Sequence, residues 1–384
     1  MAGSEMAGTE MTALIRLPGR PGPLLIRKPP WAASHPGPTA RRVYAAAHVA
    51  AFPDGTIDWE STAGFREHLW SHGFGVAEAM DTAQRGMGLS WDQAKELISH
   101  SARRAAERGA ALACGAGTDQ LPGGTHSLAR IVRAYEEQLG FIQSAGAQVI
   151  LMASRALAAS ARSSRDYTDV YLHLLGQAQR PVILHWLGEA FDPQLRGYWG
   201  APDFGTAAST VLELVKLADG KIDGIKLSVL DPGCEVALRG RLPAGVRLYT
   251  GDDFNYAELI KGGPGGHSDA LLGAFAAITA PAAEALRFLD DGDVSRYAEI
   301  IGGTVALSRK IFEEPTFNYK AGIGFLAWLN GLQPHFAMLD RFQERRPAGH
   351  LIDVFELAAT AGALLEPGLA VERMERYLAD GRRM

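Results

Sequence analysis

Short apolar segments alternate with longer helical segments eight times along this chain, and this alternation constrains the fold more than any other feature. Each apolar segment is six to nine residues long, is bounded by turn-forming residues, and has the composition of a buried strand. Their starts lie 24 to 41 residues apart, close to what one strand, one helix and two loops require. The predicted strands are Val43–Val49, Gly75–Met80, Ala111–Ala116, Gln148–Ala153, Pro181–Trp186, Ile222–Val229, Val246–Gly251 and Ala270–Ile278.

Eight repeats of strand and helix predict an α/β fold, a (β/α)8 TIM barrel, with a doubly wound open sheet as the second possibility. Helices with apolar periodicity fill the gaps, and Ser90 followed by Gln93 is typical of a capped helix start. A nucleotide-binding fold is disfavoured, because no GxGxxG follows the first strand and no GxxxxGK[ST] occurs.

Two regions lie outside the barrel pattern. Apolar runs on either side of Pro-Gly-Arg-Pro-Gly predict a β-hairpin within residues 1–40. The barrel is expected over residues 41–282 and a helical C-terminal region over 283–384. The expected C-terminal helices are Ala282–Leu289, Asp293–Glu313, Tyr319–Leu332, Gln333–Phe342 and a pair between His350 and Arg382.

Composition excludes several classes of protein. The composition, with 47% hydrophobic and 21% charged residues, predicts a globular protein. Because no run of about 18 apolar residues occurs, we expect no membrane span. A net charge of −5 argues against nucleic-acid binding. Two cysteines and no secretory signal predict a cytoplasmic protein. Apolar Trp328, Leu332 and Phe336 suggest a homo-oligomer interface, although such spacing is also typical of an intramolecular core.

Lys226 is the strongest candidate for a catalytic residue. Alternation along the sixth strand directs Ile225 and Leu227 toward the surrounding helices, so Lys226 points into the barrel. Gly224 is expected to leave room beside the amine. Desolvation lowers the pKa of a lysine and makes its amine a nucleophile, as Schiff-base chemistry requires. The structural alternative is a strand-end lysine in a salt bridge.

The segments IDGIKLS, RLYTGDDFNYAELIKGG and LLGAFAAITAP together resemble the class I aldolase family of dihydrodipicolinate synthase and N-acetylneuraminate lyase. The resemblance covers roughly residues 43 to 332 and implies a Schiff-base lysine at Lys226. It implies a 2-keto acid or keto-sugar substrate, C–C cleavage, condensation or dehydration, and no cofactor. The segment 72–90 resembles the strand-two loop that holds the substrate carboxylate, which points to Asp81 and Thr82 as substrate-binding residues.

Two departures from the family pattern affect the expected site. The carboxylate loop reads Asp-Thr-Ala-Gln, so only Thr82 matches one of its two threonines. The catalytic tyrosine of the family falls on Ala153-Ser154-Arg155, where no tyrosine is present. His185, at the end of the fifth strand, is the preferred substitute for proton transfer, since its ordinary pKa near 6.5 suits that task. A core histidine bonded to a backbone carbonyl is the alternative.

Charged residues at other strand ends complete the predicted site. Arg155 is expected to pair with a substrate carboxylate, or else to be a solvated loop residue. Asp252 is expected to bind substrate hydroxyls or to cap a helix, and capping is at least as plausible for Asp253. Together with Glu78, Asp81 and Asp119, Asp252 would give an acidic mouth suited to a neutral polyhydroxylated sugar. Glu78 and Asp252 are also the salt-bridge partners that the structural alternative gives to Lys226.

Two further hypotheses about function remain open. His126, His185 and His267 with Glu78 or Asp252 would permit a metal-assisted lyase or epimerase, although no metal-binding motif supports a site. The missing tyrosine would also suit a non-catalytic barrel that binds a small carbonyl ligand.

Overall fold

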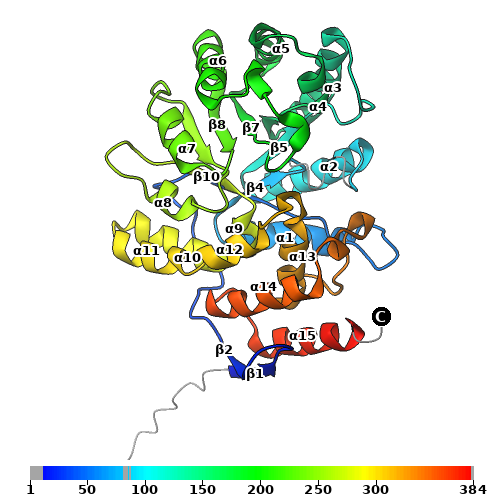
Figure 1. Ribbon diagram of the computed structural model, residues 1–384, viewed down its shortest axis with the longest axis vertical. Coiled ribbons are helices and arrows are strands. Elements are labelled where there is room, and N and C mark those ends of the chain that lie inside the picture. Colours follow the sequence, from blue (N-terminus) through cyan, green and yellow to red (C-terminus); the bar gives the residue numbers. More distant parts are fainter. Residues whose placement is uncertain (1–11, 81–84, 86–87, 382–384) are drawn as a thin grey trace, which may run out of the picture.

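The eight predicted strands close into a parallel barrel in the computed structural model (Figure 1). The structure describes residues 12–80, 85 and 88–381. Around the barrel the strands run in the order β10-β3-β4-β5-β6-β7-β8-β9, and β10 pairs with β3. The TIM barrel prediction is therefore confirmed over the open sheet. The barrel strands are β3 (Val43–Ala46), β4 (Gly75–Glu78), β5 (Leu112–Ala116), β6 (Gln148–Leu151), β7 (Val182–Leu187), β8 (Ile222–Ser228), β9 (Arg247–Thr250) and β10 (Asp269–Leu272).

Helices follow the strands and continue beyond the barrel. As predicted, Ser90 begins α2, and the Ser90 and Gln93 side chains cap each other's backbone N–H groups. The helices of the barrel are α1 (Trp59–Ser71), α2 (Trp91–Arg108), α3 (Leu128–Ser144), α4 (Arg155–Ser160), α5 (Ser164–Gln177), α6 (Phe204–Leu217), α7 (Pro232–Arg239), α8 (Tyr256–Lys261) and α9 (Ala274–Ala277). Beyond them lie α10 (Thr279–Asp290), α11 (Val294–Gly302), α12 (Val305–Ile311), α13 (Lys320–Leu329), α14 (Ala348–Thr360) and α15 (Pro367–Gly381). Short 3-10 helices are η1 (Pro193–Leu195), η2 (Tyr198–Gly200), η3 (Thr316–Asn318) and η4 (Leu339–Arg345).

Three predicted elements differ from the structure. The predicted strand Ala270–Ile278 ends at Leu272, and its second half is α9, because β3 and β9 offer pairing partners only to the first residues. The predicted helix Asp293–Glu313 breaks at Thr304, whose hydroxyl donates to the Ile301 carbonyl at 2.6 Å and begins a new helix. The predicted helix Gln333–Phe342 is replaced by an irregular segment leading into η4.

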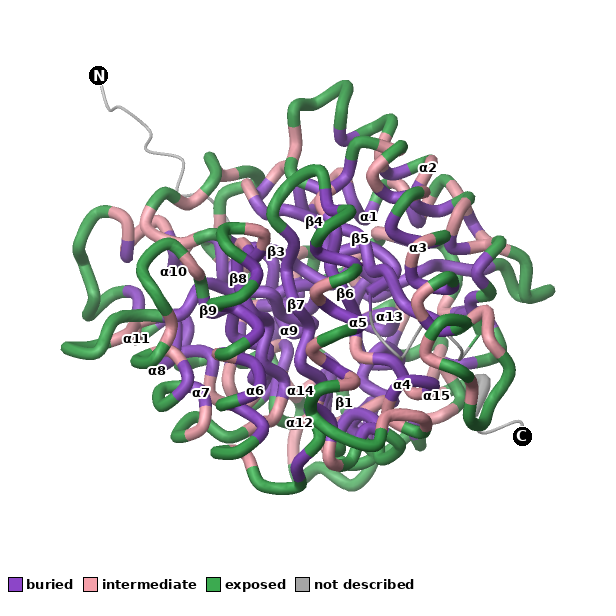
Figure 2. The backbone as a smooth tube through the Cα atoms, turned by 90° about the horizontal axis from the view of Figure 1, so that it is seen from above, coloured by how far each residue is buried: buried purple, intermediate pink, exposed green. Residues whose placement is uncertain are grey.

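Two hydrophobic clusters account for the core. One fills the barrel interior with small and flexible side chains such as Ala77, Ala113, Met80 and Met152. The other surrounds the barrel, lies between its strands and helices, and extends into the C-terminal helices and the hairpin. Figure 2 shows the buried strands at the centre, surrounded by exposed segments. No helix among the described residues is long and apolar enough to cross a membrane.

The N-terminal hairpin and the C-terminal helices pack onto this shared outer core. Strands β1 (Thr12–Arg16) and β2 (Pro23–Arg27) pair as the predicted hairpin and lie against α15 and α14 (Figure 1). The proposed interface residues Trp328 and Phe336 instead stack on each other within the chain, 5.9 Å between ring centroids.

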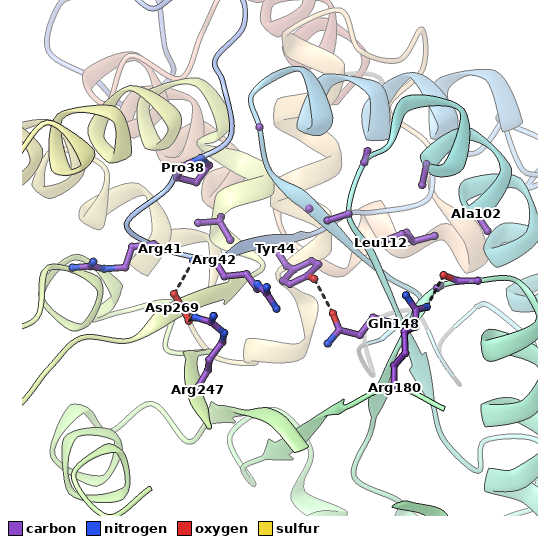
Figure 3. Close-up of a pocket in the computed structure, with 18 of the residues that line it drawn as sticks. Pro38, Arg41, Arg42, Tyr44, Ala102, Leu112, Gln148, Arg180, Arg247 and Asp269 are labelled. Atoms are coloured by element: carbon purple, nitrogen blue, oxygen red, sulfur yellow. Dashed lines mark hydrogen bonds and ion pairs between the residues drawn. The ribbon is translucent and has the colours of Figure 1, made fainter. Parts of the chain in front are cut away.

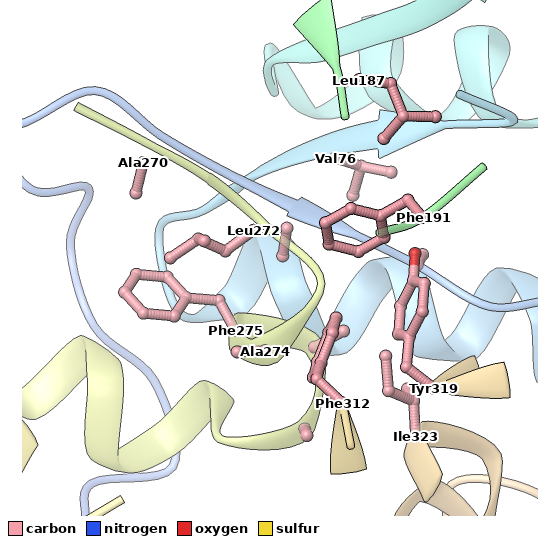
Figure 4. Packing of buried hydrophobic residues seen from close by; sticks show 14 of the residues in the cluster. Val76, Leu187, Phe191, Ala270, Leu272, Ala274, Phe275, Phe312, Tyr319 and Ile323 are labelled. Carbon is pink, nitrogen blue, oxygen red and sulfur yellow. The ribbon is translucent and has the colours of Figure 1, made fainter. Parts of the chain in front are cut away.

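Aromatic packing joins α12 and α13 to the barrel (Figure 4). Phe312 is fully buried and stacks on Tyr319 with ring centroids 4.3 Å apart. A Cβ at Gly273, which links β10 to α9, would lie 2.7 Å from the Tyr319 ring and 2.8 Å from the Phe312 ring. The glycine therefore permits this close approach.

We expect Phe312→Ala to lower the free energy of unfolding by about 3–5 kcal/mol, because it leaves a cavity where the helices meet the barrel. Leu217→Ala, at a side chain that is 52% exposed, serves as the control and should change stability by less than about 0.5 kcal/mol. Urea unfolding followed by circular dichroism measures both. Equal effects of the two substitutions would contradict this account of the packing.

Candidate active site

A cavity of about 310 Å³ opens at the carboxyl end of the barrel strands. In barrels of this kind the working residues lie at this end, on the loops that follow the strands. Side chains that follow β4, β5, β6 and β7 line the cavity. They include Met80, Arg85, Thr118, Asp119, Met152, Ser154, Arg155, His185, Leu187 and Asp192.

Lys226 lies beside this cavity, with its side chain inside the barrel as alternation predicts and only 6% of the residue exposed. Its Nζ is 3.8 Å from Sδ of Met80, which lines the cavity. Gly251 makes room for the amine, because a Cβ there would lie 2.9 Å from Cε of Lys226. The prediction that Gly224 does so is wrong, since a Cβ at Gly224 would meet the Tyr249 ring instead.

His185 lies next to Lys226 in the register of β7 and β8 and lines the cavity. Its Nε2 lies 3.3 Å from Oγ of Ser228. This contact is with a hydroxyl group, whereas the alternative in the sequence analysis was a bond to a backbone carbonyl. Burial, and then the positive charge of Lys226, hold the pKa of His185 well below its ordinary value. The imidazole is therefore neutral near pH 7, and it is a weaker base than the ordinary pKa used in the sequence analysis implied.

The two aspartates after β9 have different surroundings. Asp252 accepts hydrogen bonds from the backbone N–H groups of Phe254 and Asn255, at 2.9 and 3.0 Å, and so shapes the turn before α8. Asp253 is buried and accepts from the Ala274 N–H at 2.7 Å. Burial raises the pKa of Asp253 to about 7, against the opposing effects of that hydrogen bond and of the nearby Lys226 charge. Asp253, which sequence reasoning had not preferred, is thus a buried carboxyl group whose pKa responds to the Lys226 charge.

The structure does not bring Glu78 to the cavity. Glu78 is fully buried and accepts two hydrogen bonds from the Arg66 guanidinium, each 2.8 Å long. The Ser101 hydroxyl donates a third at 2.7 Å. This carboxylate joins β4 to α1 and α2, and we leave it out of the proposed site.

Charges at the cavity rim are paired. Arg155, 41% exposed, donates from Nε to Asp192 at 2.6 Å, and Arg85 donates from Nε to Asp119 at 3.0 Å. With Asp252 used in a turn, the predicted acidic mouth is absent from the described part of the chain. The preference for a neutral sugar loses its basis, because the rim carries as many arginines as aspartates.

Several hydroxyl groups lie around Ser154, one of the three residues on which the sequence resemblance places the tyrosine of the family. Oγ1 of Thr118 and Oγ of Ser154 are 2.6 Å apart, and both residues line the cavity. The Tyr198 hydroxyl accepts from the Ser154 N–H at 3.0 Å and lies 3.0 Å from the Tyr171 hydroxyl. Sequence reasoning missed this network. The only signal was that Ser154 directly follows a predicted strand, because Tyr198 comes from the three-residue 3-10 helix η2, which is too short to show periodicity.

The remaining predicted residues are not assembled into a site. Asp81 and Thr82 lie outside the described residues. His126 contacts the Pro122 carbonyl on a surface loop, and His267 precedes β10 at the opposite end of the barrel from His185. Within the ranges described above, no group of three or more His, Cys, Asp or Glu residues could hold a metal ion.

Asp253 makes the stability of the protein depend on pH. Its pKa is about 7 in the folded state and near 4 in the unfolded state, so the folded protein holds this proton more tightly. The stability that Asp253 gains from this difference is fully present below pH 4 and is lost as the pH rises through 7. Asp253→Asn removes this titration. We therefore expect the wild type to lose about 2 kcal/mol more stability than the variant between pH 5 and pH 8. Urea unfolding at pH 5 and at pH 8 measures this loss of stability. The control Asp291→Asn, at an exposed carboxylate, should lose as much stability between the two pH values as the wild type does. The same loss in Asp253→Asn as in the wild type would contradict the assignment.

Comparisons with known proteins place the chain in a family and a fold. The model of a family described as protein of unknown function (DUF993) matches residues 23–381. A comparison with curated proteins finds no match. Among solved structures, dihydrodipicolinate synthase from Aquifex aeolicus is 15% identical with a TM-score of 0.65, and the match covers 85% of this chain and 99% of that chain.

Two further structures agree with this result. The synthase from Thermotoga maritima is 14% identical with a TM-score of 0.63, covering 85% of this chain and 100% of that one. The synthase from Acinetobacter baumannii, solved in complex with pyruvate, is 17% identical with a TM-score of 0.60 and the same coverage. At these identities the likeness is one of fold, and at that level it confirms the resemblance found in the sequence. The chain therefore belongs to the DUF993 family and has the barrel fold of the dihydrodipicolinate synthases.

Proposed function

We propose that this protein is a class I aldolase or lyase whose Lys226 forms a Schiff base with a 2-keto acid or keto-sugar derivative. The observation that carries the proposal is the position of Lys226: a buried amine inside the barrel, beside a cavity at the carboxyl end of the strands. A purely structural lysine has no need of a neighbouring cavity whose walls carry a neutral histidine and hydroxyl groups.

The proposed chemistry balances without a cofactor. The Lys226 amine adds to the substrate carbonyl carbon, and the resulting carbinolamine loses water, so that a C=N bond replaces the C=O bond. The protonated imine then withdraws electrons from the adjacent C–C or C–H bond, which allows cleavage, condensation or dehydration. Hydrolysis of the imine returns the free lysine.

Proton transfers in this scheme are assigned to His185 and to the Thr118–Ser154 pair. His185 lies next to Lys226 across the β7–β8 register, and its imidazole holds a proton only transiently, because burial and the Lys226 charge disfavour the cationic form. The hydroxyls of Thr118 and Ser154, 2.6 Å apart at the cavity wall, can pass a proton to and from a carbinolamine oxygen. They take over the task of the missing family tyrosine.

A substrate with one carboxylate fits the charges at the rim best. Arg155 is 41% exposed and engages Asp192 through Nε, which leaves its guanidinium accessible from the cavity. Asp81 and Thr82 remain proposed substrate contacts on the strength of the sequence resemblance. Pyruvate, present in the Acinetobacter baumannii structure, is the first substrate to test. We also retain the prediction of a cytoplasmic homo-oligomer; the two cysteines are unpaired in the structure.

Borohydride reduction in the presence of pyruvate tests the proposal. We expect a reduced adduct on the peptide that contains Lys226, read by intact and peptide mass spectrometry. Lys226→Gln should abolish the adduct, whereas Lys216→Gln, at an exposed lysine on α6, should leave it unchanged.

No Lys226 adduct across a panel of keto acids and keto sugars, with the protein still folded, would overturn the proposal and favour a barrel that only binds its ligand. An adduct on Lys216 alone would show nonspecific reaction at the surface.

Ser154→Ala tests the hydroxyl assignment separately. Since Ser154 would transfer a proton during imine formation, we expect the rate of adduct formation with pyruvate to fall roughly 100-fold. Ser209→Ala, at an exposed serine of α6, is the control and should keep the wild-type rate. A wild-type rate in Ser154→Ala would remove Ser154 from the mechanism and leave Lys226 in place.

A further inference from the structure

A second cavity, of about 660 Å³, lies at the amino end of the barrel strands, opposite the candidate active site (Figure 3). Its walls come mainly from residues at or just before the starts of β3, β4, β5, β6, β7, β9 and β10, and on one side from alanines of α2. In barrels of this type the amino end serves mainly stability, and nothing in the proposed aldolase chemistry uses it. Its composition therefore requires a separate explanation.

Positive charge is concentrated in this cavity. Four arginines line it, Arg41, Arg42, Arg180 and Arg247, against one aspartate, Asp269. The chain as a whole carries a net charge of −5. A basic cavity on an acidic protein attracts small anions.

Arg42 and Arg247 are held in place yet remain accessible. Arg42 contacts Asp223 at 3.1 Å and Arg247 contacts Asp269 at 2.9 Å, each through Nη1. Their side chains are 44% and 43% exposed, whereas the two carboxylates are 17% and 5% exposed. The carboxylates thus orient the guanidinium groups from behind without enclosing them.

Other hydrogen bonds fix these carboxylates. Asp269 also accepts from the Arg42 backbone N–H at 2.7 Å, and Asp223 accepts from the Tyr249 hydroxyl at 2.6 Å. Groups that are oriented before a ligand arrives lose less entropy on binding, so this arrangement favours affinity. Arg41 differs, because it donates to the backbone carbonyls of Ile260 and Lys261 and points away from the cavity (Figure 3).

Polar groups continue across the cavity. The Tyr44 hydroxyl donates to Oε1 of Gln148 at 2.9 Å, and both side chains lie between the Arg42–Arg247 pair and Arg180 (Figure 3). Arg180 is exposed and donates to the Gly146 carbonyl at 2.7 Å. A ligand that contacts both the pair and Arg180 must extend past Tyr44 and Gln148, and the cavity volume is in the range of small-molecule sites.

We propose that this cavity binds a small metabolite with two or more oxyanion groups, one of them held between the guanidinium groups of Arg42 and Arg247. Guanidinium groups bind phosphate and carboxylate oxygens through paired N–H donors, and both anions share this chemistry. The second anionic group lies toward Arg180. This site is independent of the proposed Schiff-base chemistry at the other end of the barrel.

Thermal shift and calorimetric titration of the full-length protein test the site, with pyrophosphate and citrate as probes and glucose as the neutral control. We expect an anion to stabilise the wild type, and Arg42→Gln/Arg247→Gln to weaken its binding roughly tenfold or more. Arg165→Gln/Arg376→Gln removes the same charge from exposed positions on α5 and α15 and should bind as the wild type does. Pyrophosphate acting alone identifies a phosphate site, and citrate acting alone identifies a carboxylate site.

A measurement without variants guards against a folding defect in Arg42→Gln/Arg247→Gln. Phenylglyoxal modifies accessible arginines, and peptide mass spectrometry reports each position. The effective anion should protect Arg42 and Arg247 in the wild type and leave Arg165 reactive. Three results would overturn the proposal and assign these arginines to stability alone. They are equally weakened anion binding in both double variants, no protection of Arg42 and Arg247 from phenylglyoxal, and no stabilisation of the wild type by either anion.

Discussion

Lys226 brings an amine into the interior of a closed barrel whose other inward side chains are mostly alanine, methionine, isoleucine and leucine. Burying a cation in such surroundings is costly unless polar partners and space are provided. The structure provides space through Gly251, and the Lys226 charge in turn lowers the pKa of the nearby Asp253, which burial raises to about 7. The neutral state of His185 follows from the same burial and from the neighbouring Lys226 charge. Much of the carboxyl end of the barrel can be understood as an adaptation to this one amine.

The two ends of the barrel treat charge in different ways. At the carboxyl end each cavity-lining arginine is paired with an aspartate, so the cavity is close to neutral and selects by shape and hydroxyl groups as much as by charge. At the amino end four arginines line the cavity against one aspartate, and Arg42 and Arg247 remain accessible although each contacts a carboxylate. A substrate site and a separate anion site can coexist on one barrel, because the packed interior between them keeps the two cavities apart.

Features fixed by periodicity could be predicted from the sequence. The position of Lys226 inside the barrel follows from strand alternation, and the start of α2 follows from its capping residues. Features that depend on contacts distant in sequence could not. Asp252 and Asp253 are adjacent in the sequence and both buried, and only the positions of their partners, such as the distant Ala274 N–H, give the two carboxyl groups different roles.

The same limit explains the other differences. Gly251 rather than Gly224 clears space for Lys226, because neighbouring strands are staggered in a barrel. The contact between Ser154 and Tyr198 joins the region after β6 to the 3-10 helix η2, which is too short to show a periodic pattern. The strand predicted to reach Ile278 ends early, because apolar composition alone does not distinguish a strand from the short buried helix α9.

A crystal structure of the protein grown with pyruvate tests the central claim most directly. The account predicts continuous electron density between Nζ of Lys226 and the C2 atom of pyruvate, with the carboxylate toward Arg155. Pyruvate bound in the cavity with Lys226 separate from it, or bound only at another lysine, would contradict the account.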